Sequence, residues 1–351
     1  MITRTTLLAS LSIAAFWAAQ PSDAYADIYP SRPITMIVPF PAGGPSDTIA
    51  RIVSERMSTT LAQPIVIENV TGAAGTIGAG RVARASPDGY TLCLGFLGTH
   101  VLNGAIYALQ YDVVKDFEPI ALLASNPQLI VAKKTAPAKD LKELIAWLKE
   151  NPGKATQGTA GVGSPSHVSG AYFQSATGTT FQFAQYRGAA PAMQDPVGGH
   201  VDLMFDQPPN SLPHVRDGNI KAYAVTGKVR LASAPDIPTV DEAGLPGFHV
   251  TVWSGLWAPK GTPQEVISQL NAAVVDALAN QSVQRRLADL GQDVPARDQQ
   301  TPAVLAAFQA AEIERWWPIV RAMNLQTKYS QETFVRLDCA FAAVEGAKNV
   351  A

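Results

Sequence analysis

The sequence predicts an α/β fold with mixed, mostly parallel sheets and flanking helices. Short apolar runs rich in β-branched residues alternate along the chain with amphipathic helical patterns, as in strand–helix–strand units. The chain has 351 residues, of which 47% are hydrophobic, and this is enough for two domains with cores of their own. No internal repeat of fixed period is present, so a solenoid or propeller is not expected.

The first predicted elements are a strand, a helix and two further strands. Residues 34–40 form an apolar run typical of a buried parallel strand, and residues 65–68 and 90–96 are similar. A helix is predicted around Ser46 and Asp47 onward, with either residue as its cap, because apolar residues there recur at helical spacing. The residues of its apolar face are Ile49, Ile52, Val53, Met57 and Leu61.

The middle of the chain continues this alternation. Two short apolar runs fall in residues 121–133, and residues 140–150 have the amphipathic pattern of a helix. Further strand-like segments are residues 155–160, 181–186, 201–206 and 220–226. Strands that alternate with helices in this way favour parallel sheets.

Two helices are predicted towards the C-terminal end. Thr262 is the expected N-cap of a long helix, with Pro263 in its first turn. Its apolar face is formed by Ile267, Leu270, Val274 and Leu278. Ser282 is the expected cap of the next helix, which should end near Gly291.

The first 26 residues have the pattern of an export signal. Arg4 precedes an apolar stretch over residues 7–19, which is too short to span a bilayer, and Ala24-Tyr25-Ala26 forms an A-x-A cleavage site. We expect cleavage after Ala26 and a mature protein in a bacterial periplasm. No later segment is apolar for long enough to predict a transmembrane helix.

Composition excludes several classes of function. The net charge of −2 and the scattered basic residues argue against nucleic-acid binding. Cys93 and Cys339 are far apart, and the five histidines include no pair at metal-ligand spacing, so we predict no metal site. Dinucleotide and P-loop motifs are absent as well, and we predict no cofactor.

Three loops that run from a predicted strand into a predicted helix carry the functional signal. They are residues 40–47, 158–167 and 186–192, and each contains glycine, which lets a ligand approach the main chain closely. Helix N-termini present free N–H groups and partial positive charge, so they bind carboxylates and phosphates. In open α/β sheets such loops lie at the carboxyl ends of the strands. Together they predict an anion site between the domains.

The sequence also contains the residue types of a serine hydrolase triad. Ser164, Asp206 and His214 follow the chain order of an α/β-hydrolase triad. However, Pro165 follows the candidate nucleophile, and proline has no N–H to donate to an oxyanion hole. We predict that the protein is not an enzyme and has no catalytic residues.

A set of motifs in a fixed order extends over residues 29–326. The motifs are Pro39-Phe40-Pro41-Ala42-Gly43-Gly44 with Asp47, Ala85-Ser86-Pro87-Asp88-Gly89-Tyr90-Thr91-Leu92, Gly163-Ser164 with His167, Tyr186-Arg187-Gly188, Ala190-Pro191-Ala192, Pro235-Asp236-Ile237-Pro238-Thr239, Glu242-Ala243-Gly244, Trp253-Ser254-Gly255 and Ala258-Pro259-Lys260-Gly261-Thr262-Pro263. With these motifs the chain resembles the periplasmic solute-binding proteins of tripartite tricarboxylate transporters, the Bug or TctC family.

The resemblance implies a two-lobed, type II-like Venus flytrap that closes on a carboxylate and delivers it to membrane permease subunits. The implied carboxylates are di- and tricarboxylates, acidic amino acids and aromatic acids. We expect a monomer with one domain from residues 27–126 plus 251–326 and a second from residues 127–250. Residues 327–351 extend past the usual end of the family and have no assigned role.

The candidate ligand-binding residues come from the three loops and their surroundings. They are Phe40, Ala42, Gly43, Gly44, Ser46, Asp47, Thr99, Gly163, Ser164, His167, Gly188, Ala189, Ala190 and Asp206. Asp47 and Ser164 are also good helix caps, and His167 is equally compatible with packing inside a helix. Asp206 would repel an anion, so it should meet an amino group, a hydroxyl group or a loop N–H. A periplasmic sensor that presents its ligand to a receptor kinase, or an exported hydrolase, remains as an alternative function.

Overall fold

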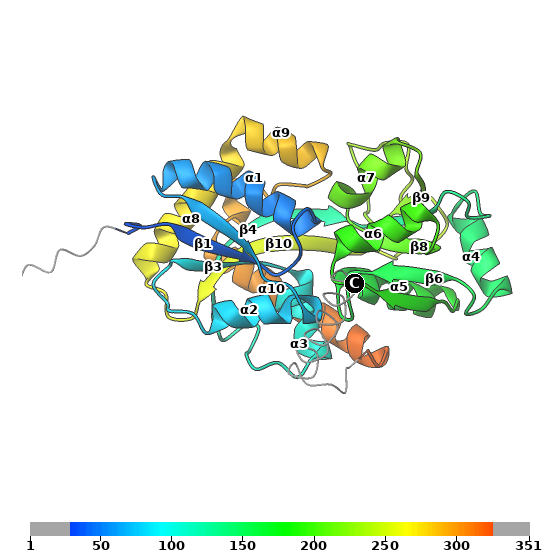
Figure 1. The fold of residues 1–351 in the computed structure, drawn as a ribbon, viewed down its shortest axis with the longest axis horizontal. Helices are drawn as coiled ribbons and strands as arrows, with labels where there is room; N and C mark the ends of the chain where they lie inside the picture. Colours follow the sequence, from blue (N-terminus) through cyan, green and yellow to red (C-terminus); the bar gives the residue numbers. More distant parts are fainter. Residues whose placement is uncertain (1–28, 326–351) are drawn as a thin grey trace, which may run out of the picture.

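The computed structural model describes residues 29–325, which form two lobes, each built around a five-stranded sheet (Figure 1). The predicted two-lobed α/β fold is confirmed. The predicted export signal, residues 1–26, and the C-terminal extension, residues 327–351, lie outside the described residues. Within residues 29–325, no helix has the length and apolar character needed to cross a membrane.

The sheet of the first lobe has the strand order β2-β1-β3-β10-β4. These strands are Ile34–Val38 (β1), Ile65–Asn69 (β2), Thr91–Phe96 (β3), Phe117–Pro127 (β4) and Thr251–Pro259 (β10). β1 pairs in parallel with β2 and β3, whereas β10 runs antiparallel to both of its neighbours. A strand from late in the chain therefore completes a sheet that begins at the N-terminus.

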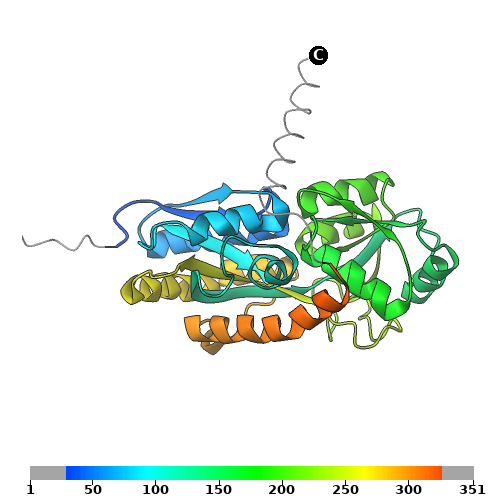
Figure 2. The same cartoon turned by 90° about the horizontal axis from the view of Figure 1, so that it is seen from below.

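Two helical layers cover this sheet, one above it and one below it in the view of Figure 1, and Figure 2 views the sheet from the side of the lower layer. The helical segments are α1 (Pro45–Thr60), η1 (Ala73–Gly75), α2 (Thr76–Ala83), η2 (Gly98–Leu102), α3 (Asn103–Ile106), α8 (Gln264–Ala279), α9 (Gln281–Asp289), η3 (Arg297–Gln299) and α10 (Pro302–Ala322). Successive side chains of a strand point to opposite faces. Met36 and Val38 accordingly pack in the core with α1, α8 and α9, while Ile37 packs in the core with α2 and α10.

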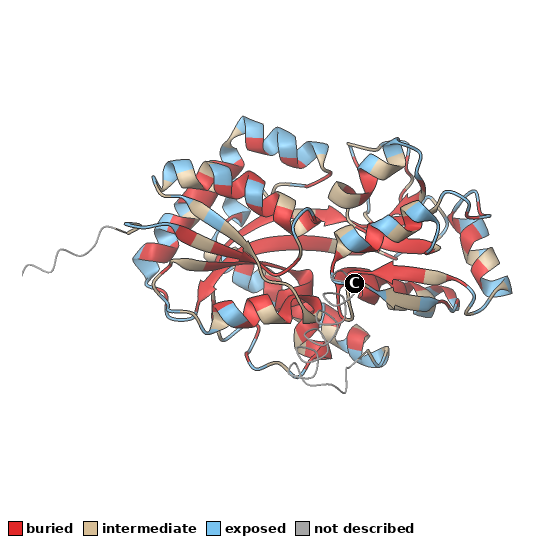
Figure 3. Cartoon of the chain, viewed as in Figure 1, coloured by how far each residue is buried: buried red, intermediate tan, exposed pale blue. Residues whose placement is uncertain are grey.

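The second lobe has the strand order β7-β6-β8-β5-β9, with β5 antiparallel to β8 and β9. Its elements are β5 (Leu129–Lys133), α4 (Leu141–Glu150), β6 (Thr156–Thr159), α5 (Pro165–Thr177), β7 (Gln182–Gln185), α6 (Ala189–Gly198), β8 (Leu203–Asp206), α7 (Pro208–Arg216) and β9 (Ile220–Val225). Leu129 and Val131 face α6 and α7, while Ile130 and Ala132 belong to the core with α4 and α5. Apart from the edge strands β2 and β7, the strands of both lobes are buried along most of their length (Figure 3).

The chain crosses between the lobes at two adjacent places. β4 passes through Gln128 into β5, and the chain returns from Val250 into β10. Thr226 ties the crossings together, because its Oγ1 donates to the carbonyl of Val250 at 2.6 Å and accepts from the N–H of Gln128 at 2.8 Å. The predicted domain boundaries fall at these crossings and stay a prediction.

Three predicted helix starts differ from the structure. α1 begins at Pro45 with Gly44 as N-cap, so Ser46 and Asp47 lie inside the first turn. The N-cap of α8 is Pro263 and not Thr262, and the hydroxyl of Thr262 donates to the carbonyl of Pro259 instead. α9 is capped by Asn280, whose Oδ1 accepts from the N–H groups of Ser282 and Val283.

Candidate ligand-binding site

Two connected pockets lie between the lobes. The inner pocket has a volume of about 30 Å³ and is lined by Phe40, Pro41, Gly44, Pro45, Ser46, Phe96, Gln128, Ala160, Pro165, Ser166, Ala189, Ala190, Phe205, Asp206 and Gln207. The outer pocket has a volume of about 480 Å³ and is lined by Phe40, Gly72, Ala73, Ala74, Gly75, Tyr107, Ala160, Gly161, Val162, Gln185, Tyr186, Arg187 and Pro191. Phe40 and Ala160 belong to both pockets, so the two form one cleft.

The N-termini of four helices converge on the inner pocket. The lining residues at these helix starts are Gly44, Pro45 and Ser46 of α1, Pro165 and Ser166 of α5, Ala189 and Ala190 of α6, and Gln207 of α7. The first N–H groups of a helix have no partner within the helix, and each N-terminus is equivalent to about half a positive charge. Four N-termini together carry a charge equivalent to about +2. Ionised Asp206 offsets one of these charges, so a net charge of about +1 is left to attract one anionic group.

A larger groove elsewhere lacks this feature. It has a volume of about 740 Å³, lies beside the crossings and is lined by Lys228, Arg230 and Arg315 among others. None of the residues that line it begins a helix. Since four helices begin at the smaller cleft and none at the larger groove, the cleft is the candidate site.

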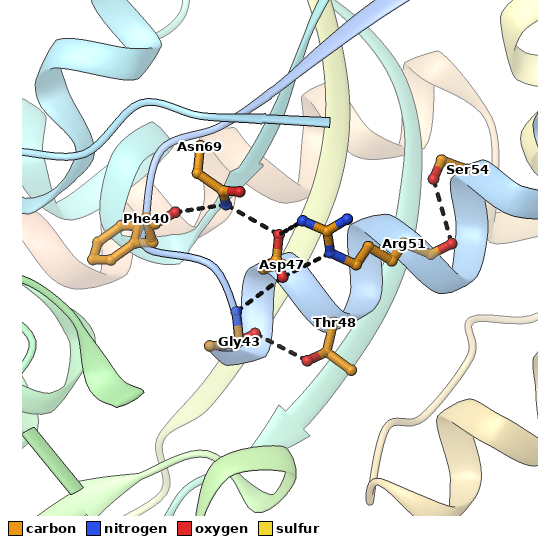
Figure 4. A network of polar contacts seen from close by, with 8 residues as sticks. Phe40, Gly43, Asp47, Thr48, Arg51, Ser54 and Asn69 are labelled. Carbon is orange, nitrogen blue, oxygen red and sulfur yellow. Dashed lines mark hydrogen bonds and ion pairs between the residues drawn. The ribbon is translucent and has the colours of Figure 1, made fainter. Parts of the chain in front are cut away.

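A polar network fixes the loop between β1 and α1 (Figure 4). Gly43 has a φ of +79°, a left-handed conformation that favours glycine, although a Cβ there would meet no atom within 4 Å. The carboxylate of Asp47 accepts from the N–H of Gly43 at 2.9 Å, from Arg51 at 2.9 and 3.0 Å, and from Asn69 at 3.0 Å. Asn69 also donates to the carbonyl of Phe40 at 2.9 Å. Burial raises the pKa of Asp47, but these hydrogen bonds outweigh it and the net pKa is lowered.

The turn before α5 is held by its own side chains. Ser164 is the N-cap, as predicted, and its Oγ accepts from the N–H of His167 at 3.4 Å. His167 is buried and its Nδ1 accepts from the N–H of Gly163 at 3.2 Å. Burial lowers the pKa of His167 to about 4, so the ring is neutral at physiological pH. Both side chains therefore shape the turn.

Asp206 is the last residue of β8 and lines the inner pocket. Its side chain is buried, and its Oδ2 accepts from Ser211 Oγ at 2.6 Å and from Asn210 Nδ2 at 2.7 Å. Desolvation raises the pKa of Asp206 to about 6, although the hydrogen bonds from Ser211, Asn210 and the Gln207 backbone lower it. At neutral pH the inner pocket thus contains one ionised carboxylate surrounded by helix N-termini.

The lobes touch each other across the cleft. The hydroxyl of Tyr107 in the first lobe donates to the carbonyl of Val162 in the second. A Cβ built on Gly163 would lie 2.9 Å from Cε2 of Tyr107, and one built on Gly188 would lie 2.7 Å from Cδ of Pro41. Glycines of the second lobe therefore allow the close approach that encloses the inner pocket.

Comparison with known proteins agrees with this architecture. A profile of the family described as "Tripartite tricarboxylate transporter family receptor" matches residues 49–325. The chain belongs to this family. The predicted membership in the Bug, or TctC, family of periplasmic solute-binding proteins is thereby confirmed.

Individual known proteins resemble the chain over most of its length. A protein of Agrobacterium vitis, described as "UPF0065 protein in the TAR-I ttuE-ttuC' intergenic region", is 42% identical over 299 residues, which cover 85% of either chain. The structure of the periplasmic binding protein BugD has a TM-score of 0.82 and 39% identity, with 85% of this chain and 99% of that chain covered. MatC from Rhodopseudomonas palustris, solved with bound malate, has a TM-score of 0.81 and 44% identity, with 83% and 100% covered.

The structure of this family member divides the predicted site residues into two groups. Phe40, Gly44, Ser46, Ala189, Ala190 and Asp206 line the inner pocket. Ala42, Gly43, Asp47, Thr99, Gly163, Ser164, His167 and Gly188 line neither pocket. Thr99 is buried beside β3, where its hydroxyl accepts from the N–H of Phe96 and lies 2.9 Å from His100 Nδ1.

Several lining residues were not among the predicted site residues. The inner pocket adds Phe96, Gln128, Ser166, Phe205 and Gln207, and the outer pocket adds Tyr107, Tyr186 and Arg187. The start of α7 could have been predicted from the sequence. Pro208 is the first residue of the helix and comes just after a strand and Gln207, in the same way that Pro165 begins α5 after Ser164. No sequence signal points to Gln128, because this residue lies in a crossing between two strands. In residues 29–325, no cluster of His, Cys, Asp and Glu side chains has the makings of a metal site.

Proposed function

We propose that the protein is an extracytoplasmic receptor that captures a small carboxylate in the cleft and delivers it to the permease of a tripartite tricarboxylate transporter. The observation that carries the proposal is the convergence of four helix N-termini on the inner pocket. Membership in a receptor family and a malate-bound relative with 44% identity support the carboxylate class. The export pattern of residues 1–26 supports a periplasmic location after cleavage at Ala26.

In this function one carboxylate of the ligand enters the inner pocket and accepts hydrogen bonds from the free N–H groups of the helix starts. Hydrogen bonds to charged groups are worth roughly 1.5–3 kcal/mol each, so a few of them suffice for micromolar affinity, about −8 kcal/mol, after the costs of closure. The rest of the ligand occupies the outer pocket, whose charged lining side chain is Arg187. The protein acts as a monomer and catalyses no reaction.

Thermal denaturation of the mature protein against a carboxylate panel tests the proposal. The panel contains mono-, di- and tricarboxylates, acidic amino acids and aromatic acids. A ligand at 100 times its Kd adds about 2.7 kcal/mol to the free energy of unfolding, which is a visible shift in Tm. A shift for one chemical class is the expected result, and no shift for any acid would contradict the carboxylate assignment. Uptake of the same labelled acid, lost when the gene is deleted, tests delivery to a permease.

A further inference from the structure

The carboxylate of Asp206 has hydrogen-bonding capacity left over. An ionised carboxylate offers about four acceptor sites. Asn210, Ser211 and the Gln207 backbone use three of them, and both side-chain donors bind to Oδ2. Oδ1 accepts none of the side-chain hydrogen bonds found within residues 29–325, and no ion pair to Asp206 is found there. Since Asp206 is 2% exposed, the remaining acceptor site faces the pocket, where a ligand group or a water molecule can meet it.

A ligand carboxylate cannot satisfy this site, because its oxygens are acceptors too. Asp206 is the one titratable side chain among the residues that line the inner pocket. No lining lysine or arginine stands between it and a bound anion. A ligand held by the helix N-termini therefore contacts Asp206 directly and favourably only if it also carries a hydrogen-bond donor, and otherwise a water molecule must stand between the two carboxylates.

The charge at the site favours a hydroxyl group over an ammonium group as that donor. An ammonium group would bring positive charge to a place where four helix N-termini already point. A hydroxyl donates to Asp206 without that repulsion.

We infer that Asp206 makes this receptor selective for hydroxy acids, in which a hydroxyl group adjoins the carboxylate held by the helix N-termini. The inference rests on the proposed function and adds its specificity. Asp206 accepts the hydrogen bond of the ligand hydroxyl directly, whereas an acid without the hydroxyl reaches Asp206 only through an immobilised water molecule. Selectivity then resides in the second lobe, at the junction of β8 and α7.

Calorimetry on the mature protein with matched pairs of acids tests the inference. The pairs are L-malate with succinate, citrate with tricarballylate, and L-lactate with propionate, at about pH 7.5, above the pKa of Asp206 of about 6. In the pair that fits the cleft, the hydroxy acid should bind about tenfold or more tightly than its partner. Asp206→Asn should bring this ratio towards one, because the amide presents its NH₂ group to the ligand and relieves the repulsion of the acid without a hydroxyl.

A matched control lies at the other end of the same strand. Asp202 directly precedes β8 and pairs with Lys133 at 2.7 Å, outside both pockets. Asp202→Asn should keep the wild-type ratio. The wild-type ratios decide the question even if Asp206→Asn does not fold.

The possible outcomes separate the inference from the function on which it rests. Equal affinities within every pair that binds would overturn the selectivity and leave the carboxylate receptor standing. Failure of all three hydroxy acids to bind would also overturn it, while the wider thermal panel decides the function. Binding of L-aspartate in preference to L-malate would show that the donor is an ammonium group and would overturn the hydroxyl assignment.

Discussion

The two lobes contribute different chemistry to one cleft. The first lobe supplies one helix start, that of α1, and the aromatic rings of Phe40 and Phe96, whose centroids are 5.1 Å apart. The second lobe supplies the starts of α5, α6 and α7 together with Asp206. In the proposed function, the second lobe supplies most of the groups that recognise the charge of the ligand, while the first adds one helix start and an apolar wall.

A negative charge introduced at the start of α6 should have the largest predicted effect on ligand binding. Ala190 is the second residue of α6 and lines the inner pocket. Two like charges about 4 Å apart repel by about 4 kcal/mol at an effective dielectric constant of 20, so Ala190→Asp should weaken binding by more than about 100-fold. Ala303→Asp is the matched control, because Ala303 is the second residue of α10 and lines neither pocket. Calorimetry that found equal affinities for the two variants would remove α6 from the site.

The contributions of the two buried aspartates Asp47 and Asp206 to stability should respond to pH in opposite directions. Desolvation raises the pKa of Asp206 from 3.8 to about 6, so folded protein holds this proton more tightly than unfolded protein. Its contribution to stability is complete below about pH 4 and is lost as the pH rises through about 6, a loss of about 3 kcal/mol. Asp47 has a lowered pKa, so its contribution is present at neutral pH and is lost on acidification below 3.8.

Urea denaturation across this pH range checks the contrast. The stability of wild type relative to Asp206→Asn should fall between about pH 4 and pH 6. The stability of wild type relative to Asp47→Asn should fall below about pH 4 instead. Parallel profiles for wild type and Asp206→Asn would mean that Asp206 is solvated or paired.

Closure of the first lobe over the second depends on the small size of Gly163. This residue has a φ of +82°, and a Cβ there would lie 2.9 Å from the ring of Tyr107. Gly163→Ala should weaken binding by about tenfold and cost about 1 kcal/mol of stability. Gly153→Ala is the control, because Gly153 has a φ of +71° and no atom within 4 Å of a built Cβ. It should lose similar stability with unchanged affinity, and equal losses of affinity would contradict the closure argument.

The smallest predicted effect compares one helix cap from each lobe. Ser164 caps α5 at the cleft, and Thr301 caps α10 away from it, each by accepting from the N–H three residues on. Replacement by alanine should cost about 1 kcal/mol of stability in either case. Only Ser164→Ala should also weaken ligand binding, by a few-fold, because it loosens the turn that presents Ser166. Unchanged affinity would limit Ser164 to stabilising its helix.

Much of the fold could be predicted because most of its strands are buried runs, and several of them lead into glycine-containing loops. β10 was missed because Ser254 and Gly255 interrupt its pattern between two buried tryptophans, Trp253 and Trp257. α10 was missed because its sequence is rich in alanine and has an internal proline, Pro318, so one apolar face does not stand out. Which residues of α10 are buried depends on its packing against η2 and β4, and the local sequence does not reveal these contacts.

The candidate site was predictable where main-chain geometry decides it. Glycine loops before helices identified the starts of α1, α5 and α6, and all three line the inner pocket. The roles of polar side chains depend on partners far away in sequence or across the loop, as with Asp47 and Asn69. Gln128 and Tyr107 reach the cleft only because the two lobes meet, which no local pattern encodes.

The most direct test of charge recognition by the second lobe is a crystal structure of the mature protein with the acid that binds most tightly in the thermal panel. We predict a ligand carboxylate in the inner pocket, within hydrogen-bond distance of the backbone nitrogens of Ser166 and Ala190. A carboxylate held by the Arg187 side chain in the outer pocket, with no part of the ligand at the helix starts, would contradict the recognition proposed here.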